Sequence, residues 1–147
     1  MGLSQGKTRF MKILFDTNII IDVILKREPF YTDSRNALNK SDGYILEGFI
    51  LASTLTDIYY ICKKQLGHSA TIEIIKNLVD SINILNVNRD TIVLALHADF
   101  SDFEDAVQSA SAELNQIDLI ISRNTRDFSN SKITTQTPTA FLEKHNQ

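Results

Sequence analysis

Four stretches of the chain place an acidic side chain shortly beyond a predicted strand or near the predicted start of a helix. These acids are Asp16, Asp57, Asp105 and Asp127. Carboxylates that converge on one point repel one another unless a cation lies among them, and an oxygen-only ligand set selects a hard divalent ion such as Mg²⁺ or Mn²⁺. Such an ion activates water and neutralises charge on a phosphate. The four acids are therefore candidate catalytic and metal-binding residues for hydrolysis of a phosphodiester.

Three of the four acids also have a structural explanation. Asp16 suits a helix cap or a turn, while Asp57 and Asp105 fit the third helical position of a capping box. Taken singly, each of these three acids fits this structural role better than catalysis. Taken together, they favour a site, because a parallel sheet directs the first turns of its following helices toward one edge.

The histidines offer no clear alternative as a catalytic base. His68, His97 and His145 fall outside the four acidic stretches, on a predicted turn, a helix face and the tail. Since no acid is placed to orient them, each is assigned a structural or solvated role. This favours water as the nucleophile.

Alternating strands and helices are expected to position the acids. The expected strands cover residues 13–15, 43–51, 84–87, 117–122 and 133–135. The expected helices cover residues 18–25, 31–40, 53–66, 71–82, 89–98 and 103–114, with a last helix starting at 137–138 and caps at Asn18 and at Ser53 or Thr54. This alternation predicts an α/β fold with a central, mainly parallel sheet. The apolar run 13–15 is typical of a central strand buried on both faces.

Length and composition indicate one small domain. The chain has 147 residues, and we expect an extension over residues 1–10 and a single domain over residues 11–147. The lone cysteine, Cys62, is expected to be a buried thiol in a reducing compartment. No apolar run approaches the roughly 18 residues of a membrane span. Residues 1–10 also lack the apolar core of a signal peptide, so a cytoplasmic protein is expected.

The charge balance limits how the chain can meet nucleic acid. Fifteen basic and 18 acidic residues give a formal charge of −3, which argues against non-specific coating of a polyanion. A nucleic-acid substrate then requires local basic residues. Arg123 and Arg126, beside the fourth acid, are the candidates for contact with substrate phosphates. Ordinary solvated surface charge is the alternative for both.

The acidic stretches resemble the PIN domain family, and more narrowly its small prokaryotic members similar to the VapC ribonuclease toxins. The matching segments are LFDTNIIID at 14–22, TLTDIYY at 54–60, FEDAVQ at 103–108 and IISRNTRDF at 120–128. Together with Thr137–Pro138 and Phe141–Leu142, they span nearly the whole chain from Met11 to Leu142.

The resemblance implies a three-layer α/β/α sandwich with a sheet of about five strands, and cleavage of single-stranded RNA with Mg²⁺ or Mn²⁺. Asp16 and Asp105 match the first and third acids of the family, and Asp57 matches the second, which is more often Glu. Asn18 matches the polar residue that supports the first acid. The fourth acid stays open, because Asn124 stands where the family frequently has Asp, and Asp127 lies one helical turn beyond. The resemblance also implies a homodimer and, for a toxin, a small cognate antitoxin protein.

Two other functions remain open on the sequence. One is a degenerate PIN-like module that binds RNA or protein without cutting, which the departures at Asp57 and Asn124 allow. The other is a phosphohydrolase of the haloacid dehalogenase type, in which an Asp after the first strand is the nucleophile. Such enzymes usually carry a second Asp two residues on, where this chain has Asn18. Trapping of an aspartyl-phosphate mimic by beryllofluoride would distinguish that enzyme.

Overall fold

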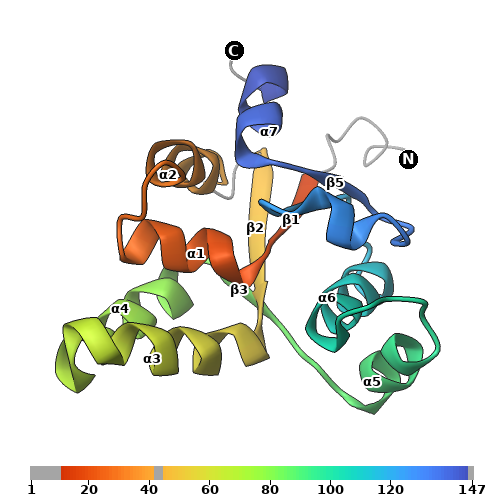
Figure 1. Ribbon diagram of the computed structural model, residues 1–147, viewed down its shortest axis with the longest axis horizontal. Coiled ribbons are helices and arrows are strands. Elements are labelled where there is room, and N and C mark those ends of the chain that lie inside the picture. The colour runs from red at the N-terminus through yellow and green to blue at the C-terminus, as the bar shows by residue number, and fades with distance from the viewer. Residues whose placement is uncertain (1–10, 42–44, 146–147) are drawn as a thin grey trace, which may run out of the picture.

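The computed structural model describes residues 11–41 and 45–145, which form a parallel sheet covered by helices on both faces (Figure 1). The sheet has five strands in the order β3-β2-β1-β4-β5, and every adjacent pair is parallel. The strands are β1 (Met11–Phe15), β2 (Leu46–Leu51), β3 (Asn83–Leu85), β4 (Leu119–Ile121) and β5 (Thr134–Gln136). This architecture confirms the predicted α/β fold.

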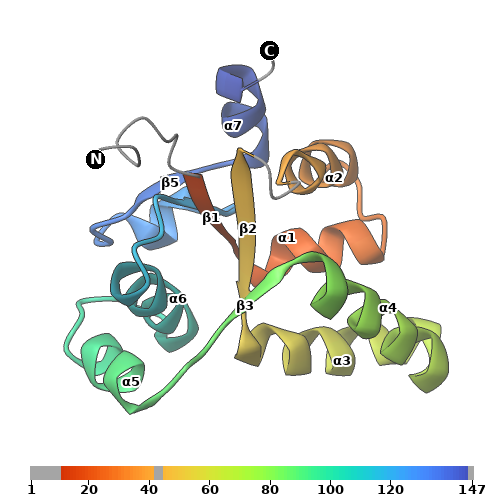
Figure 2. The ribbon, with the colours of Figure 1, turned by 180° about the vertical axis from the view of Figure 1, so that it is seen from behind.

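The helices divide between the two faces of the sheet. They are α1 (Thr17–Ile24), α2 (Tyr31–Lys40), α3 (Ala52–Leu66), α4 (His68–Ser81), α5 (Arg89–Leu96), α6 (Phe103–Leu114) and α7 (Pro138–His145). The first four and α7 gather on one side of β1 and β2, while α5 and α6 pair on the other (Figure 2). The result is the three-layer sandwich that the sequence predicts. Among the described residues, none of the helices combines the length and apolarity needed to cross a membrane.

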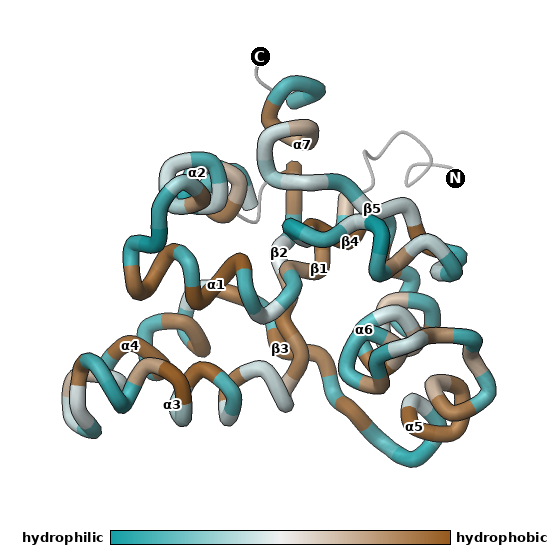
Figure 3. Tube along the Cα trace, viewed as in Figure 1, coloured by the Kyte–Doolittle hydropathy of each residue, from teal (hydrophilic) through white to brown (hydrophobic). Residues whose placement is uncertain are grey.

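Strand β1 is the centre of the core. Ile13 and Phe15 pack into the cluster beneath α1, whereas Leu14 packs into the cluster beneath α6, and all three side chains are fully buried. This two-sided burial follows from the alternation of side chains along a strand. It confirms the prediction for residues 13–15, and Figure 3 shows the apolar centre of the trace. Cys62 is buried in the first cluster, also as predicted.

Three helices begin earlier than predicted, and one of them is α4, which starts at His68 and not at residue 71. Helix α1 starts at Thr17, so Asp16 and not Asn18 is its N-cap residue, and α3 starts at Ala52, so the predicted caps at Ser53 and Thr54 are wrong. In both cases the helix follows the strand almost directly, and the strand end fixes where the helix begins. The predicted strand 43–51 begins at Leu46, with residues 43 and 44 outside the described residues.

The cap of α6 and the loop after β4 match the sequence closely. The Asp102 carboxylate caps α6 by accepting a hydrogen bond of 3.0 Å from the Asp105 backbone N–H. Beyond β4, residues Thr125–Phe128 form a short 3-10 helix, η2, which leads to the edge strand β5. These two segments, with the start of α1, carry most of the predicted acids.

Candidate active site

The predicted acids gather at the carboxyl end of the sheet. Asp16 directly follows β1, and β1 lies between β2 and β4. Helix α3 follows β2 without a loop, so Asp57 lies in its second turn. Because all the strands are parallel, these chain segments leave the sheet at the same edge.

Asp16 is held in a buried polar pocket. Its side chain is 5% exposed. Ser122 Oγ donates a hydrogen bond of 2.7 Å to Asp16 Oδ2, and Gln108 Nε2 approaches Oδ1 at 3.5 Å. Burial raises the pKa of Asp16, while the Ser122 and Thr17 hydrogen bonds and the Arg123 charge oppose that rise. The carboxylate is therefore fixed in direction, which suits a ligand and explains why it makes no cap bond to α1.

A second set of hydrogen bonds lies behind Asp16 and joins three helices. Gln108 Nε2 on α6 donates to Thr17 Oγ1 at 3.3 Å, and Thr17 Oγ1 lies 3.0 Å from Thr54 Oγ1 on α3. All three side chains are buried. Thr54 therefore links α3 to α1 instead of capping α3, and Gln108 was not predicted as a partner of either side chain.

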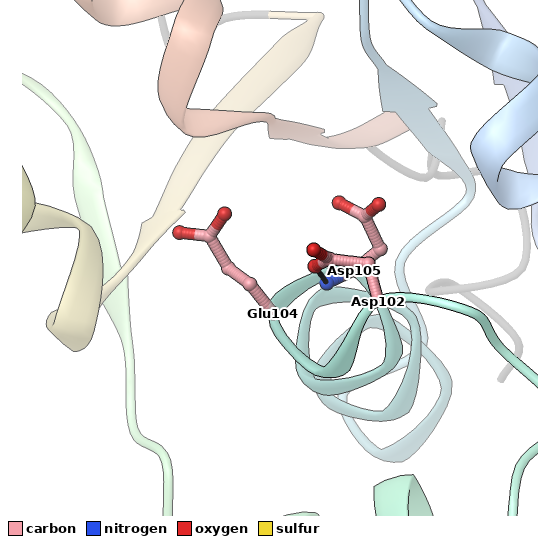
Figure 4. Close-up of side chains that lie close together, drawn as sticks. All are labelled: Asp102, Glu104 and Asp105. Atoms are coloured by element: carbon pink, nitrogen blue, oxygen red, sulfur yellow. Dashed lines mark hydrogen bonds between the residues drawn. The ribbon is translucent and has the colours of Figure 1, made fainter.

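Three acids cluster at the first turn of α6. One carboxylate oxygen from each of Asp102, Glu104 and Asp105 lies within 4.8 Å of the others, so together they could hold an ion. Figure 4 shows the three side chains projecting from the start of this helix. Burial, followed by the negative charges of Asp16, Asp102 and Asp127, raises the pKa of Asp105 to about 7. Asp105 thus lies in the field of acids from α1 and η2 as well as its own helix.

Glu104 also belongs to this group, although it was not among the acids predicted from the sequence. Burial, a side-chain hydrogen bond with Asp57 and the charges of Asp57, Asp16 and Asp105 raise its pKa to about 7. The Asp57 carboxyl group on α3 is therefore close enough to act on Glu104 at the start of α6. The available signal was the position of Glu104 beside Asp105 in one of the four acidic stretches.

The remaining predicted residues lie around these acids. Asp127, on η2, is close enough for its charge to raise the pKa of both Asp16 and Asp105. Asn124 is exposed, and its backbone N–H donates to Ser122 Oγ at 3.1 Å. Asn18 is half-buried in the first turn of α1, and Arg126 is exposed on η2. Of the two candidates for the fourth acid, Asp127 is thus the one whose charge acts on Asp16 and Asp105.

Arg123 is engaged with another acid. Its Nε lies 2.7 Å from Oδ2 of Asp22, whose side chain is fully buried on α1. Its guanidinium carbon lies 4.0 Å from the Phe30 ring centroid. Burial raises the pKa of Asp22, and the charges of Arg123 and Arg27 oppose that rise.

The chemistry of this donor set fits a hard divalent cation. The converging groups are carboxylates with oxygen atoms as their only donors, and burial together with their mutual repulsion raises the pKa of Asp105 and Glu104. A bound cation would relieve this repulsion and keep the acids ionised. Oxygen ligands without nitrogen or sulfur suit Mg²⁺ or Mn²⁺ better than Zn²⁺.

Comparison with known proteins assigns the chain to a family. The family model for the PIN domain matches residues 12–126. No curated protein gives a significant match. Among solved structures, a toxin-antitoxin complex from Klebsiella pneumoniae is 26% identical, with a TM-score of 0.65, and the match covers 86% of this chain and 97% of that chain.

Two further structures share the fold at lower identity. DNA-bound VapBC from Salmonella typhimurium is 16% identical with a TM-score of 0.67, covering 88% of this chain and 99% of that chain. VapBC2 from Rickettsia felis, bound to a promoter DNA fragment, is 12% identical with a TM-score of 0.70, covering 86% and 98%. Since the family model spans most of the sequence and the fold agrees with these structures, this protein belongs to the PIN domain family.

Proposed function

We propose that this protein is a metal-dependent endoribonuclease that hydrolyses single-stranded RNA. The observation that supports this proposal best is the convergence on Asp105 of acids from three chain segments, whose charges add to the larger effect of burial and raise its pKa to about 7. Isolated capping acids would not repel one another in this way. Membership of the PIN domain family, whose members are generally nucleases, points to the same chemistry.

Asp16, Asp105 and Glu104 would hold the cation, with Asp57 and Asp127 at its periphery. When bound, a Mg²⁺ or Mn²⁺ ion supplies activation of water and neutralisation of charge on the phosphate. Asp57 is one methylene shorter than the Glu usual in the family, and Glu104 lies against it. We propose that the longer side chain of Glu104 reaches the cation in place of Asp57.

The protein side chains have separate tasks in this proposal. Ser122 and Gln108 hold the Asp16 carboxylate in one direction, so it needs no reorganisation when substrate arrives. Arg126 is exposed beside Asp127 and would contact an RNA phosphate. Water then adds to phosphorus and one P–O ester bond breaks, which leaves a phosphate on one RNA end and a hydroxyl on the other.

The similar structures support a toxin role with a protein partner. The similar structures from Klebsiella pneumoniae and Salmonella typhimurium are a toxin-antitoxin complex and a VapBC complex. We propose that this chain likewise binds a small antitoxin and forms a homodimer. Light scattering during gel filtration measures the oligomeric state, and growth arrest on expression, relieved by a co-expressed neighbouring reading frame, tests the toxin role.

The nuclease proposal is tested with purified protein and a panel of fluorescent single-stranded RNAs. Each RNA is incubated with Mn²⁺ or Mg²⁺ and, separately, with EDTA. Cleavage is expected with metal and not with EDTA. Asp16→Asn and Asp105→Asn should each lower the cleavage rate by about 100-fold or more, because each removes a charged ligand.

Asp90→Asn is the matched control, since Asp90 is an exposed acid in the first turn of α5. Its cleavage rate should equal that of the wild type. Cleavage that survives in Asp16→Asn or Asp105→Asn would identify a contaminating nuclease or another site. RNA binding without cleavage under every metal condition would indicate a non-catalytic module instead.

A further inference from the structure

An ion pair between Asp22 and Arg123 ties the loop after β4 to helix α1. The Asp22 side chain is fully buried, and 101 residues separate it from Arg123 along the chain. Arg123 Nε lies 2.7 Å from Asp22 Oδ2, and Nη2 donates to Oδ1 at 3.4 Å. The guanidinium therefore approaches the two carboxylate oxygens with two different nitrogen atoms, whereas an ammonium group has only one.

The remaining surfaces of the Arg123 guanidinium are also largely occupied. Phe30 lies against its face, with 4.0 Å between the guanidinium carbon and the ring centroid. Arg27 approaches Asp22 as well, with Nη1 at 3.8 Å from Oδ1. The Arg123 side chain is only 22% exposed. A guanidinium held on its edge and its face has little freedom to turn toward a phosphate.

The residues on either side of Arg123 lead into the acid cluster. Ser122 Oγ donates to Asp16 Oδ2 at 2.7 Å, and the Asn124 backbone N–H donates to Ser122 Oγ at 3.1 Å. The Asp127 backbone N–H then donates to the Asn124 carbonyl at 3.0 Å. Arg123 thus anchors the loop that carries Asp127 and Ser122, whose hydroxyl orients Asp16.

We infer that Arg123 is a positioning residue, which the buried Asp22 holds so that Ser122 and Asp127 reach the acid cluster. This role replaces direct contact between Arg123 and RNA. The inference rests on the proposed function, because the cluster it serves is the proposed metal site. It assigns phosphate contact on this loop to Arg126 alone.

A double-mutant cycle with Asp22→Asn and Arg123→Met tests the coupling. Mn²⁺ affinity is measured by isothermal titration calorimetry in the wild type, both single variants and the double variant. The double variant keeps the wild-type net charge, since it loses one positive and one negative group. Each of the three variants should weaken Mn²⁺ binding by about tenfold, because one link is broken in every case. Additive losses, about 100-fold in the double variant, would overturn the inference, as would wild-type affinity in Asp22→Asn.

RNA binding in EDTA separates positioning from contact. Fluorescence anisotropy with a single-stranded RNA should give similar dissociation constants for the wild type and the charge-neutral double variant. Arg126→Met, the matched loss of a charge on the same loop, should weaken binding by several-fold. Equal weakening in the double variant and in Arg126→Met would show that Arg123 contacts RNA and would overturn the inference.

The single variants Asp22→Asn and Arg123→Met each leave one buried charge without its partner, which can unfold the protein. Arg123→Lys is the variant to use in that case. Lysine retains the charge but has no planar fork, so Mn²⁺ affinity should fall while RNA binding in EDTA persists. Wild-type Mn²⁺ affinity in a folded Arg123→Lys would contradict the inference. The two proposals can also fail separately. If the Mn²⁺ affinities of the wild type and the variants follow the expected cycle but the wild type does not cut RNA, the proposed function is overturned and the positioning role of Arg123 stands.

Discussion

Ser122 and Asp16 are joined by a hydrogen bond of 2.7 Å across 106 residues of sequence. Their contact follows from the strand register, because Phe15 of β1 pairs with Ile121 of β4 and both residues lie one step beyond that pair. Adjacent parallel strands thus bring Asp16, the first of the proposed catalytic acids, and its orienting hydroxyl to the same point. Similar positions beyond paired strands are where α/β sheets bind ligands.

Ser122→Ala should lower the cleavage rate by about tenfold. The Ser122 hydrogen bond lowers the pKa of Asp16, so its loss should raise that pKa further and move the acidic limb of the pH–rate profile to higher pH. The free energy of unfolding should fall by about 1–3 kcal/mol, because a buried acceptor loses its donor. Steady-state rates between pH 5 and 9, with urea unfolding, measure both effects.

Ser109→Ala is the control for this variant. Ser109 is equally a buried serine, and its hydroxyl lies 2.6 Å from the Ser131 hydroxyl, away from Asp16. It should lose stability and keep the wild-type pH–rate profile. If both variants shift the profile alike, the Ser122 hydroxyl has no special effect on Asp16.

Asp105→Asn should stabilise the metal-free protein while it abolishes cleavage. Asp105 has a pKa of about 7 in the folded protein and 3.8 as a model value, so the folded state binds more protons between these limits. Its ionisation therefore costs stability as pH rises from about 4 to about 7. The gain in melting temperature should be small at pH 4.5 and reach about 2–6 °C at pH 8. Thermal unfolding in EDTA measures this gain. A melting temperature of Asp105→Asn below that of the wild type at pH 8 would contradict the raised pKa of Asp105.

Mn²⁺ binding should strengthen with pH, because the cation competes with protons on the raised carboxyl groups. Glu104 and Asp105 both have a pKa of about 7, so each is partly protonated near neutrality. The apparent affinity should rise by at least about tenfold between pH 6 and pH 8, with protons released on binding. Calorimetry in buffers of different ionisation enthalpy counts those protons. Affinity that is independent of pH would show that these groups do not bind the ion.

Glu104→Gln and Asp102→Asn separate a ligand from a helix cap. Glu104→Gln should weaken Mn²⁺ binding and cleavage by about tenfold or more, because a proposed ligand loses its charge. Asp102→Asn should retain cleavage within about threefold, since Asn caps a helix as well as Asp and the bond to the Asp105 N–H is kept. The reverse order of effects would make Asp102 the ligand and Glu104 a peripheral acid.

The sequence alone determined the fold class and the neighbourhood of the site. The apolar run 13–15, alternation of strands with helices and the four acidic stretches required a parallel sheet with acids at its carboxyl edge. These features are local patterns of polarity and spacing, and such patterns fix which segments become strands and helices. Asp16, Asp57, Asp105 and Asp127 were therefore candidates for a site before any contact was known.

Only the tertiary structure decided how the acids are supported. Glu104 lies beside Asp57. The Asp16 carboxylate is held by Gln108 and Ser122, and Arg123 forms an ion pair with Asp22. Each of these contacts joins different elements of the fold, so no local pattern records it. The starts of α1 and α3 were missed for a related reason: the strand ends place these helices, and the side chains of Asp16 and Thr54 make tertiary hydrogen bonds where caps were expected. A sequence lists which groups can pair, but the packing of distant strands and helices determines which pairs form.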